Sequence, residues 1–235
     1  MKYASLSYAL SGLSRLFYPS LCACCDTELA GTEKVLCLGC TLQLPRTAYH
    51  HIMENRSFQN FMGRVPIIRA TSFVYFSKQG MVQHLLHRFK YKGRKEIGNY
   101  LGRLLAEELK KSNWLDTIDY IIPVPLHRTK MYKRGFNQAQ SFAEGIAAVS
   151  GIPVLTQAIT RNRPTETQTR KTRAARIENV RSVFSLKQPD KVGNKHILLV
   201  DDILTTGATL ESCALALQQA TQVKISIATL ALAID

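Results

Sequence analysis

One stretch near the C-terminus constrains the fold more than any other part of the sequence. Residues 197–200 form a short apolar run, the adjacent acids Asp201 and Asp202 follow it, and a Thr- and Gly-containing loop then leads into an apolar segment with helical spacing. A buried strand followed directly by a helix is the repeating unit of α/β proteins, in which ligands bind at the carboxyl ends of the strands. The stretch therefore predicts an α/β domain with a ligand site beside the two acids.

The rest of the chain indicates the same fold class, because short β-rich runs alternate with amphipathic segments of helical length. Strands are predicted over 67–76, 120–122, 152–155, 183–186, 196–200 and 223–232, and helices over 5–17, 81–89, 97–110, 137–149 and 208–219. This alternation predicts a mostly parallel sheet flanked by helices. We divide the chain into an N-terminal helix and cysteine module (1–45), a linker with a helical piece (46–66) and the α/β domain (67–235).

Five of the six cysteines lie within 19 residues near the N-terminus. Cys22 and Cys25 form one Cys-x-x-Cys pair, and Cys37 and Cys40 form a second pair after eleven residues. Each pair straddles a tight turn that directs two thiolates at one tetrahedral ion, so the spacing predicts a structural zinc site. Disulfides or unliganded thiols are the alternatives. Cys24 could replace a neighbouring ligand, although we expect it to be a bystander.

The positive charge is concentrated in two blocks. The chain has a net charge of +14, and residues 78–111 carry nine basic and three acidic side chains, while 123–181 carry eleven and three. Two basic blocks in an otherwise neutral chain indicate a polyanionic partner. A nucleic-acid backbone and a small polyphosphate both meet this requirement, and the charge does not distinguish them.

The loop after the two acids has the composition of a phosphate cradle. Small residues such as Gly207 and Ala208 let backbone N–H groups approach an anion closely, and the following helix presents its positive end to the same place. Thr205, Thr206 and Thr209 add hydroxyl donors. Carboxylates would repel a phosphate that they touched, so we interpret the two acids as acceptors for sugar hydroxyls on the same ligand.

In its order of residues, this segment resembles the 5-phosphoribosyl 1-diphosphate (PRPP) motif of type I phosphoribosyltransferases. The resemblance implies that Asp201 and Asp202 hold the ribose 2′- and 3′-hydroxyls and that residues 205–209 hold the 5′-phosphate. An acidic turn in an unrelated doubly wound protein is the alternative. A receiver domain carries its paired acids after its first strand, whereas this strand lies near the C-terminus, and a Walker P-loop is excluded because no Gly-Lys-Ser/Thr follows.

A second loop and two further basic segments match the same family pattern. The loop 123–138 predicts an anion site suited to a diphosphate, from Arg128, Lys133, Arg134 and the amides near Asn137. The resemblance implies catalytic roles for these three cations and the acid pair. Further substrate-binding residues are expected at Val124, Pro125, Leu126, His127, Lys92 and Arg94, and at Gln168, Arg170 and Arg176 in an Arg-rich stretch where these enzymes carry a mobile loop.

Together with the run 89–94 and the N-terminal cysteines, these segments resemble the ComF family of DNA-uptake competence and DNA-utilisation proteins. The resemblance implies an α/β domain of the phosphoribosyltransferase type behind a zinc ribbon, with PRPP and Mg²⁺ as ligands and an unknown acceptor. The alternative is a non-enzymatic module of the competence machinery that binds single-stranded DNA and only senses PRPP. A PRPP-responsive transcriptional regulator would need a helix-turn-helix, and none is recognisable.

The apolar runs are far shorter than the ~20 residues that a membrane helix needs. Arg15 interrupts the apolar N-terminal stretch, and no small-residue cleavage site follows it. We therefore expect a cytoplasmic protein that retains its N-terminus and has no membrane span.

Overall fold

The computed structural model describes residues 19–162 and 183–234, and within them the central element is a four-stranded sheet in the order β1-β6-β5-β2. Its strands are β1 (Arg69–Phe76), β2 (Tyr120–Pro123), β5 (His196–Leu204) and β6 (Lys224–Ala233). Every neighbouring pair is parallel. A separate antiparallel pair is formed by β3 (Ile159–Arg161) and β4 (Phe184–Leu186). The expected mostly parallel sheet flanked by helices is confirmed.

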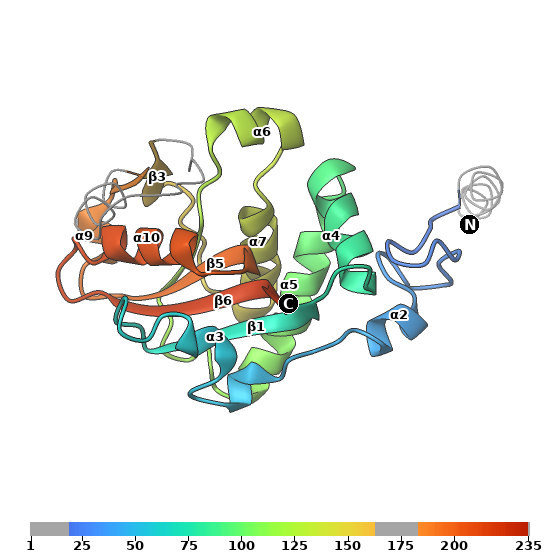
Figure 1. The fold of residues 1–235 in the computed structure, drawn as a ribbon, viewed down its shortest axis with the longest axis horizontal. Coiled ribbons are helices and arrows are strands. Elements are labelled where there is room, and N and C mark those ends of the chain that lie inside the picture. Colours follow the sequence, from blue (N-terminus) through green and yellow to red (C-terminus); the bar gives the residue numbers. More distant parts are fainter. Residues whose placement is uncertain (1–18, 163–182, 235) are drawn as a thin grey trace, which may run out of the picture.

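Helices cover both faces of the sheet (Figure 1). On one face lie α4 (Met81–Tyr91), α5 (Glu96–Lys111) and α7 (Gln138–Ser150), and on the other lie α10 (Ala208–Leu217) and the short α9 (Pro189–Val192). Successive side chains of β5 point to opposite faces of the sheet. Leu198 packs in the first core, with α4, α5 and α7, and Leu199 packs in the second core, with α10. A strand buried on both sides needs a continuous apolar run, which explains residues 197–200.

The contact between α5 and α7 depends on two glycines. A Cβ atom at Gly102 would lie 2.3 Å from the Phe142 carbonyl oxygen, and one at Gly145 would lie 2.2 Å from the Asn99 carbonyl oxygen. Any side chain at either position would push the two helices apart. α7 begins where the sequence predicts, because the Asn137 side chain accepts a hydrogen bond from the Ala139 N–H at 3.1 Å.

Four local features differ from the sequence-based expectations. β5 continues through both acids to Leu204, because β6 stays paired with it as far as Leu204 and Leu232. The expected strand 152–155 is reduced to one bridge between Val154 and Ile121, at the edge of the sheet where Pro153 has no N–H to donate. Of the expected strand 183–186, residues 184–186 pair with β3 outside the main sheet. The loop 123–138 contains a short helix, α6 (Arg128–Arg134).

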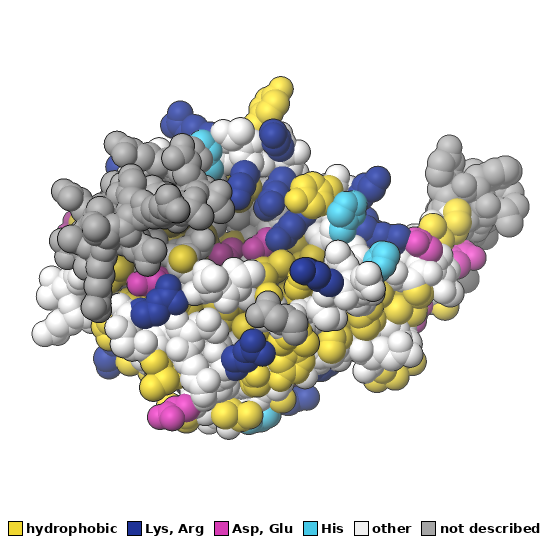
Figure 2. All heavy atoms as spheres, in the orientation of Figure 1, with side chains coloured by type: hydrophobic (Ala, Val, Ile, Leu, Met, Phe, Trp, Pro, Cys, Tyr) yellow, Lys and Arg dark blue, Asp and Glu magenta, His cyan; other side chains and the backbone are white. Residues whose placement is uncertain are grey.

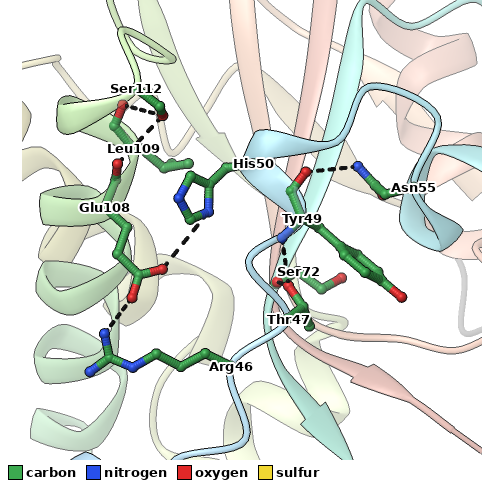
Figure 3. Close-up of polar contacts among 9 residues, drawn as sticks. All are labelled: Arg46, Thr47, Tyr49, His50, Asn55, Ser72, Glu108, Leu109 and Ser112. Atoms are coloured by element: carbon green, nitrogen blue, oxygen red, sulfur yellow. Dashed lines mark hydrogen bonds and ion pairs between the residues drawn. The ribbon is translucent and has the colours of Figure 1, made fainter.

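The stretch expected as a linker, 46–66, is fastened to the α/β domain. It contains a 3-10 helix, η1 (Tyr49–His51), and α3 (Arg56–Gln59). Figure 3 shows Arg46 paired with Glu108 of α5, and Thr47 donating a hydrogen bond to the Ser72 carbonyl of β1. The Asn55 side chain caps α3 and also donates to the Ala70 carbonyl at 2.8 Å. The domain limits themselves stay a prediction.

The N-terminal module contains α2 (Leu38–Leu42) and packs its apolar residues Val35, Leu36 and Leu44 into the core that α4 and α5 share. The expected helix over 5–17 and the site residues Gln168, Arg170 and Arg176 lie outside the described residues. Among the helices that the structure describes, none combines the length and the apolar character that crossing a membrane requires.

Candidate ligand cavity and cysteine cluster

A cavity of about 190 Å³ lies at the carboxyl ends of β2 and β5. Its lining combines the two acids of β5 with cations from three other elements: Lys90, Val124, Pro125, Leu126, Lys130, Arg134, Asn137, Gln138, Ala139, Arg161, Asp201, Asp202, Ile203 and Thr209. Figure 2 shows Lys and Arg side chains gathered around acidic side chains in a hollow below α6. This is the edge of the sheet at which α/β proteins bind their ligands.

The two carboxylates have different surroundings. Asp202 Oδ2 lies 2.7 Å from Lys90 Nζ, which places an ammonium group directly on this acid. Asp201 Oδ1 accepts a hydrogen bond from the Asp202 N–H at 2.8 Å. Burial, with a further contribution from the charge of Asp202, raises the pKa of Asp201 to about 8. At neutral pH the Asp201 carboxyl therefore largely keeps its proton.

The loop 205–207 connects the acids to α10. Gly207 has φ +75°, a left-handed conformation that glycine adopts without strain, and a Cβ atom there would lie 3.0 Å from the Phe61 ring. No side chain of the described residues caps α10, so its first N–H groups are available to a ligand. Of the predicted cradle residues, Thr209 lines the cavity, whereas Thr205, Thr206, Gly207 and Ala208 form the adjoining loop and helix start without lining it.

Arg64 fastens this loop from outside. Its guanidinium donates to the Thr206 carbonyl at 2.7 Å and to the Asn60 carbonyl at 2.9 Å, and it pairs with Glu211 of α10. Nothing in the sequence connects residue 64 with residue 206, so sequence reasoning missed this contact.

The second predicted loop contributes in part. Val124, Pro125, Leu126, Arg134 and Asn137 line the cavity. The Asn137 amide also donates to the Val124 carbonyl at 3.0 Å, which ties the two ends of the loop together.

The remaining residues predicted for this loop do not line the cavity, because residues 128–134 are helical. A helix places residues four apart on one side, so Lys130 and Arg134 face the cavity, whereas Arg128 and Lys133 do not line it. His127 acts as the N-cap of α6, accepting a hydrogen bond from the Thr129 N–H at 3.3 Å.

The basic run after α4 is also displaced from the predicted position. Lys92 ends α4 and Arg94 pairs with Glu96 at 2.6 Å, and neither lines the cavity. Lys90, two residues earlier, takes that place. Sequence reasoning did not assign Lys90, Lys130, Gln138 and Arg161 to the site, although Lys90 belongs to the run 89–94 and all three cations lie in the two basic blocks.

The four predicted cysteine ligands come together. The Sγ atoms of Cys22, Cys25, Cys37 and Cys40 all lie within 4.8 Å of one another, and those of Cys25 and Cys37 are 3.7 Å apart. Zn–S bonds of about 2.3 Å in a tetrahedron require sulfur atoms about 3.8 Å apart, so the cluster fits such an ion. Hydrogen bonding by Thr27 lowers the pKa of Cys25 to about 6, which favours the thiolate that binds metals, whereas burial raises the pKa of Cys40.

Cys24 stands beside the cluster. Its Sγ lies 3.8 Å from the Met81 carbonyl oxygen of α4, and burial raises its pKa. Cys213 is fully buried in the second core, as expected for a small apolar residue.

Known proteins show what the chain is related to. No family model matches it. The DNA utilization protein YhgH of Escherichia coli O157:H7 is 32% identical over 197 residues, which cover 83% of this chain and 82% of that protein. Competence protein F of Haemophilus influenzae is 28% identical over 207 residues, which cover 83% of this chain and 89% of that protein. The chain belongs to the ComF family.

Among solved structures, the glutamine phosphoribosylpyrophosphate amidotransferase of Bacillus subtilis matches this ComF protein with a TM-score of 0.43 and 21% identity. The match covers 61% of the ComF chain, which spans only 30% of the length of that enzyme. The membership of the ComF family that the sequence motifs imply is confirmed by the relatives, and the four-cysteine cluster is confirmed by its geometry.

Proposed function

We propose that this ComF protein binds PRPP in the cavity, with the ribose hydroxyls on Asp201 and Asp202 and the 5′-phosphate at residues 205–209. The single observation that supports this most is the placement of an acid pair beside the uncapped start of α10. Carboxylates suit a diol, and free N–H groups at a helix start suit a phosphate. A single ligand that carries a diol and a phosphate would contact both the acid pair and the start of α10.

The diphosphate of PRPP would lie among the cations of the cavity. Lys90, Lys130, Arg134 and Arg161 come from α4, α6 and β3, and they surround the acids without belonging to the phosphate loop. In the reaction, the bond from C1 of the ribose to the diphosphate breaks, the leaving group keeps the electron pair, and an acceptor forms a new bond to C1. Cations fixed beforehand around the leaving group lower the cost of its developing charge.

Mg²⁺ fits the cavity only together with the ligand. Asp202 would supply carboxylate oxygens, and Mg²⁺ commonly takes one or two carboxylates together with phosphate oxygens of the substrate. When bound, the ion would neutralise part of the diphosphate charge. The protein's own task is to bind the diol and to place four cations around the ligand. The cysteine cluster would bind zinc in a closed site that stabilises the N-terminal module.

Calorimetric titration with PRPP and Mg²⁺ tests the proposal. Asp202→Asn keeps the shape of the side chain but removes its charge, so we expect PRPP affinity to fall about 10- to 100-fold, the range for a hydrogen bond to a charged group. Asp190→Asn is the matched control, because Asp190 is exposed on α9. Equal affinities for the wild type and both variants would refute the role of the acid pair.

Release of diphosphate then tests for catalysis. PRPP and Mg²⁺ are supplied with a panel of bases, nucleotides and single-stranded oligonucleotides as acceptors. We expect diphosphate release that depends on one class of acceptor and is lost in Asp202→Asn. PRPP binding without release for any acceptor would contradict the enzymatic role.

A second function, binding of single-stranded DNA, is favoured by two exposed aromatic side chains among the cations. Tyr132 of α6 is 92% exposed and Tyr91 of α4 is 65% exposed, and the Arg134 guanidinium lies 5.8 Å from the Tyr91 ring centroid. Bases stack on such rings while cations follow the phosphates. Binding to an oligonucleotide should weaken steeply with salt and fall in Tyr132→Ala. Binding that is unaffected by both changes would contradict this function.

A further inference from the structure

We propose that the cysteine module controls the ligand cavity through α4, with Arg88 as the connection to the module and Lys90 as the connection to Asp202. The identity of the ligand in this inference rests on the proposed function. The coupling itself concerns contacts that α4 makes with both the cysteine module and the acid pair.

Arg88 of α4 contacts the tight turn that carries the first cysteine pair. Its guanidinium donates to the Cys22 carbonyl at 3.2 Å and pairs with Asp26 Oδ2 at 2.5 Å. The Asp26 N–H itself donates to the Cys22 carbonyl at 3.2 Å, so Arg88 binds both ends of one tight turn. The shape of this turn depends on Cys22 and Cys25 meeting at one point. The shape of the turn therefore determines the position of the Arg88 side chain and, through it, the position of α4.

The two residues after Arg88 enter the α/β domain. Phe89 is fully buried and lies 5.6 Å from the Phe136 ring, beneath Gly98, where a Cβ atom would come within 2.4 Å of the Phe89 ring. Lys90 Nζ then contacts Asp202 Oδ2 at 2.7 Å. The packing of Phe89 leaves little space, so a movement of this turn of α4 also moves Lys90.

Tyr91 extends the connection to the other side of the cavity, because its ring faces Arg134 of α6. Four consecutive residues of α4 thus contact the cysteine module, the core, the acid pair and the basic helix. A helix is stiff along its axis and rises about 1.5 Å per residue, so these four contacts are set together.

The expected consequence is a dependence of ligand affinity on the state of the module. Where the turn is intact, Lys90 stays beside Asp202 and close to the place proposed for the diphosphate. When Arg88 no longer contacts the turn, Lys90 is no longer held beside Asp202. We then expect PRPP affinity to fall about five- to tenfold, which is at the low end of couplings between distant sites.

A double-mutant cycle tests whether Arg88 acts through Lys90. Arg88→Ala should weaken PRPP binding about five- to tenfold in the wild-type background and less than about twofold in Lys90→Met. Arg46→Ala is the matched control, because it breaks a comparable pair with Glu108 of α5 outside α4 (Figure 3). Asp26→Asn is a milder second variant that leaves the arginine in place. An equal loss in both backgrounds, or no loss in Arg88→Ala, would overturn the inference.

Amide hydrogen exchange separates this inference from the proposed function. In the full chain without PRPP, Arg88→Ala should speed exchange over 88–91 of α4, and Arg46→Ala should not. If the wild type does not bind PRPP, the proposed function fails while this comparison still decides the coupling. Unchanged exchange over 88–91 in Arg88→Ala would overturn the coupling whatever the ligand is.

Discussion

Because the pKa of Asp201 is raised in the folded chain, we expect the free energy of unfolding to decrease as the pH rises. Desolvation of this half-buried group is the main cause that raises the pKa of its carboxyl from the usual 3.8 to about 8 in the folded chain. Between these two pH values the unfolded chain has released this proton and the folded chain has kept it. Raising the pH therefore favours the unfolded chain, and the stability present below pH 4 is lost progressively up to about pH 8.

The size of this loss of stability follows from how steeply the free energy of unfolding changes with pH. One group that is protonated only in the folded state costs about 1.4 kcal/mol for each pH unit, so Asp201 alone lowers the free energy of unfolding by about 2–3 kcal/mol from pH 5 to pH 7. For a chain of this size that corresponds to a decrease in Tm of roughly 4–12 °C. Asp201→Asn carries no titrating proton and lacks this decrease.

The assay is thermal unfolding of the wild type and Asp201→Asn at half-unit steps from pH 5 to pH 8, with Asp190→Asn as the control. The difference in Tm between wild type and variant is the informative quantity, because burial lowers the pKa of His50 and His196 and their contribution, which rises with pH, is the same in both proteins. We expect Asp201→Asn to gain stability over the wild type as the pH rises. Parallel curves would refute the assignment of a neutral carboxyl to residue 201.

Three further changes test separate parts of the account. Cys37→Ser or a strong chelator should lower Tm and loosen residues 19–45, and unchanged Tm after metal removal would argue against a structural ion. Gly102→Ala should cost about 1–3 kcal/mol of stability, measured by urea unfolding, because its Cβ meets the α7 backbone, and a neutral effect would show that the helices can separate. Arg64→Ala should weaken PRPP binding while leaving the acid pair intact, and unchanged binding would mean that the 205–207 loop needs no support from Arg64.

The layers of the fold could be predicted from the sequence because each depends on local pattern. The run 197–200 is apolar at every position, which is typical of a strand buried on both faces. The end of β5 could not be predicted, because its acids 201 and 202 look like a loop and remain in the strand through pairing with β6. Pairing between strands is a tertiary property, and local composition does not record it.

The candidate site also has one part that could be predicted from the sequence and one part that could not. The acids, Asn137 and the four cysteines belong to short motifs whose spacing carries their chemistry, and the structure brings each set together. Lys90 and Arg64 act over 112 and 142 residues of sequence separation, and such contacts have no local signal. Between residues 128 and 134, the helical phase of α6 decides which cations reach the cavity, whereas the sequence predicted a basic loop there.

The structure of the complex with PRPP and Mg²⁺, solved at a resolution that separates ribose from phosphate, tests the central claim most directly. The account predicts one ligand in the cavity, its two ribose hydroxyls within hydrogen-bonding distance of Asp201 and Asp202 and its 5′-phosphate on the N–H groups at the start of α10. A ligand bound with its diphosphate on that helix start, or bound away from the acids of β5, would contradict it.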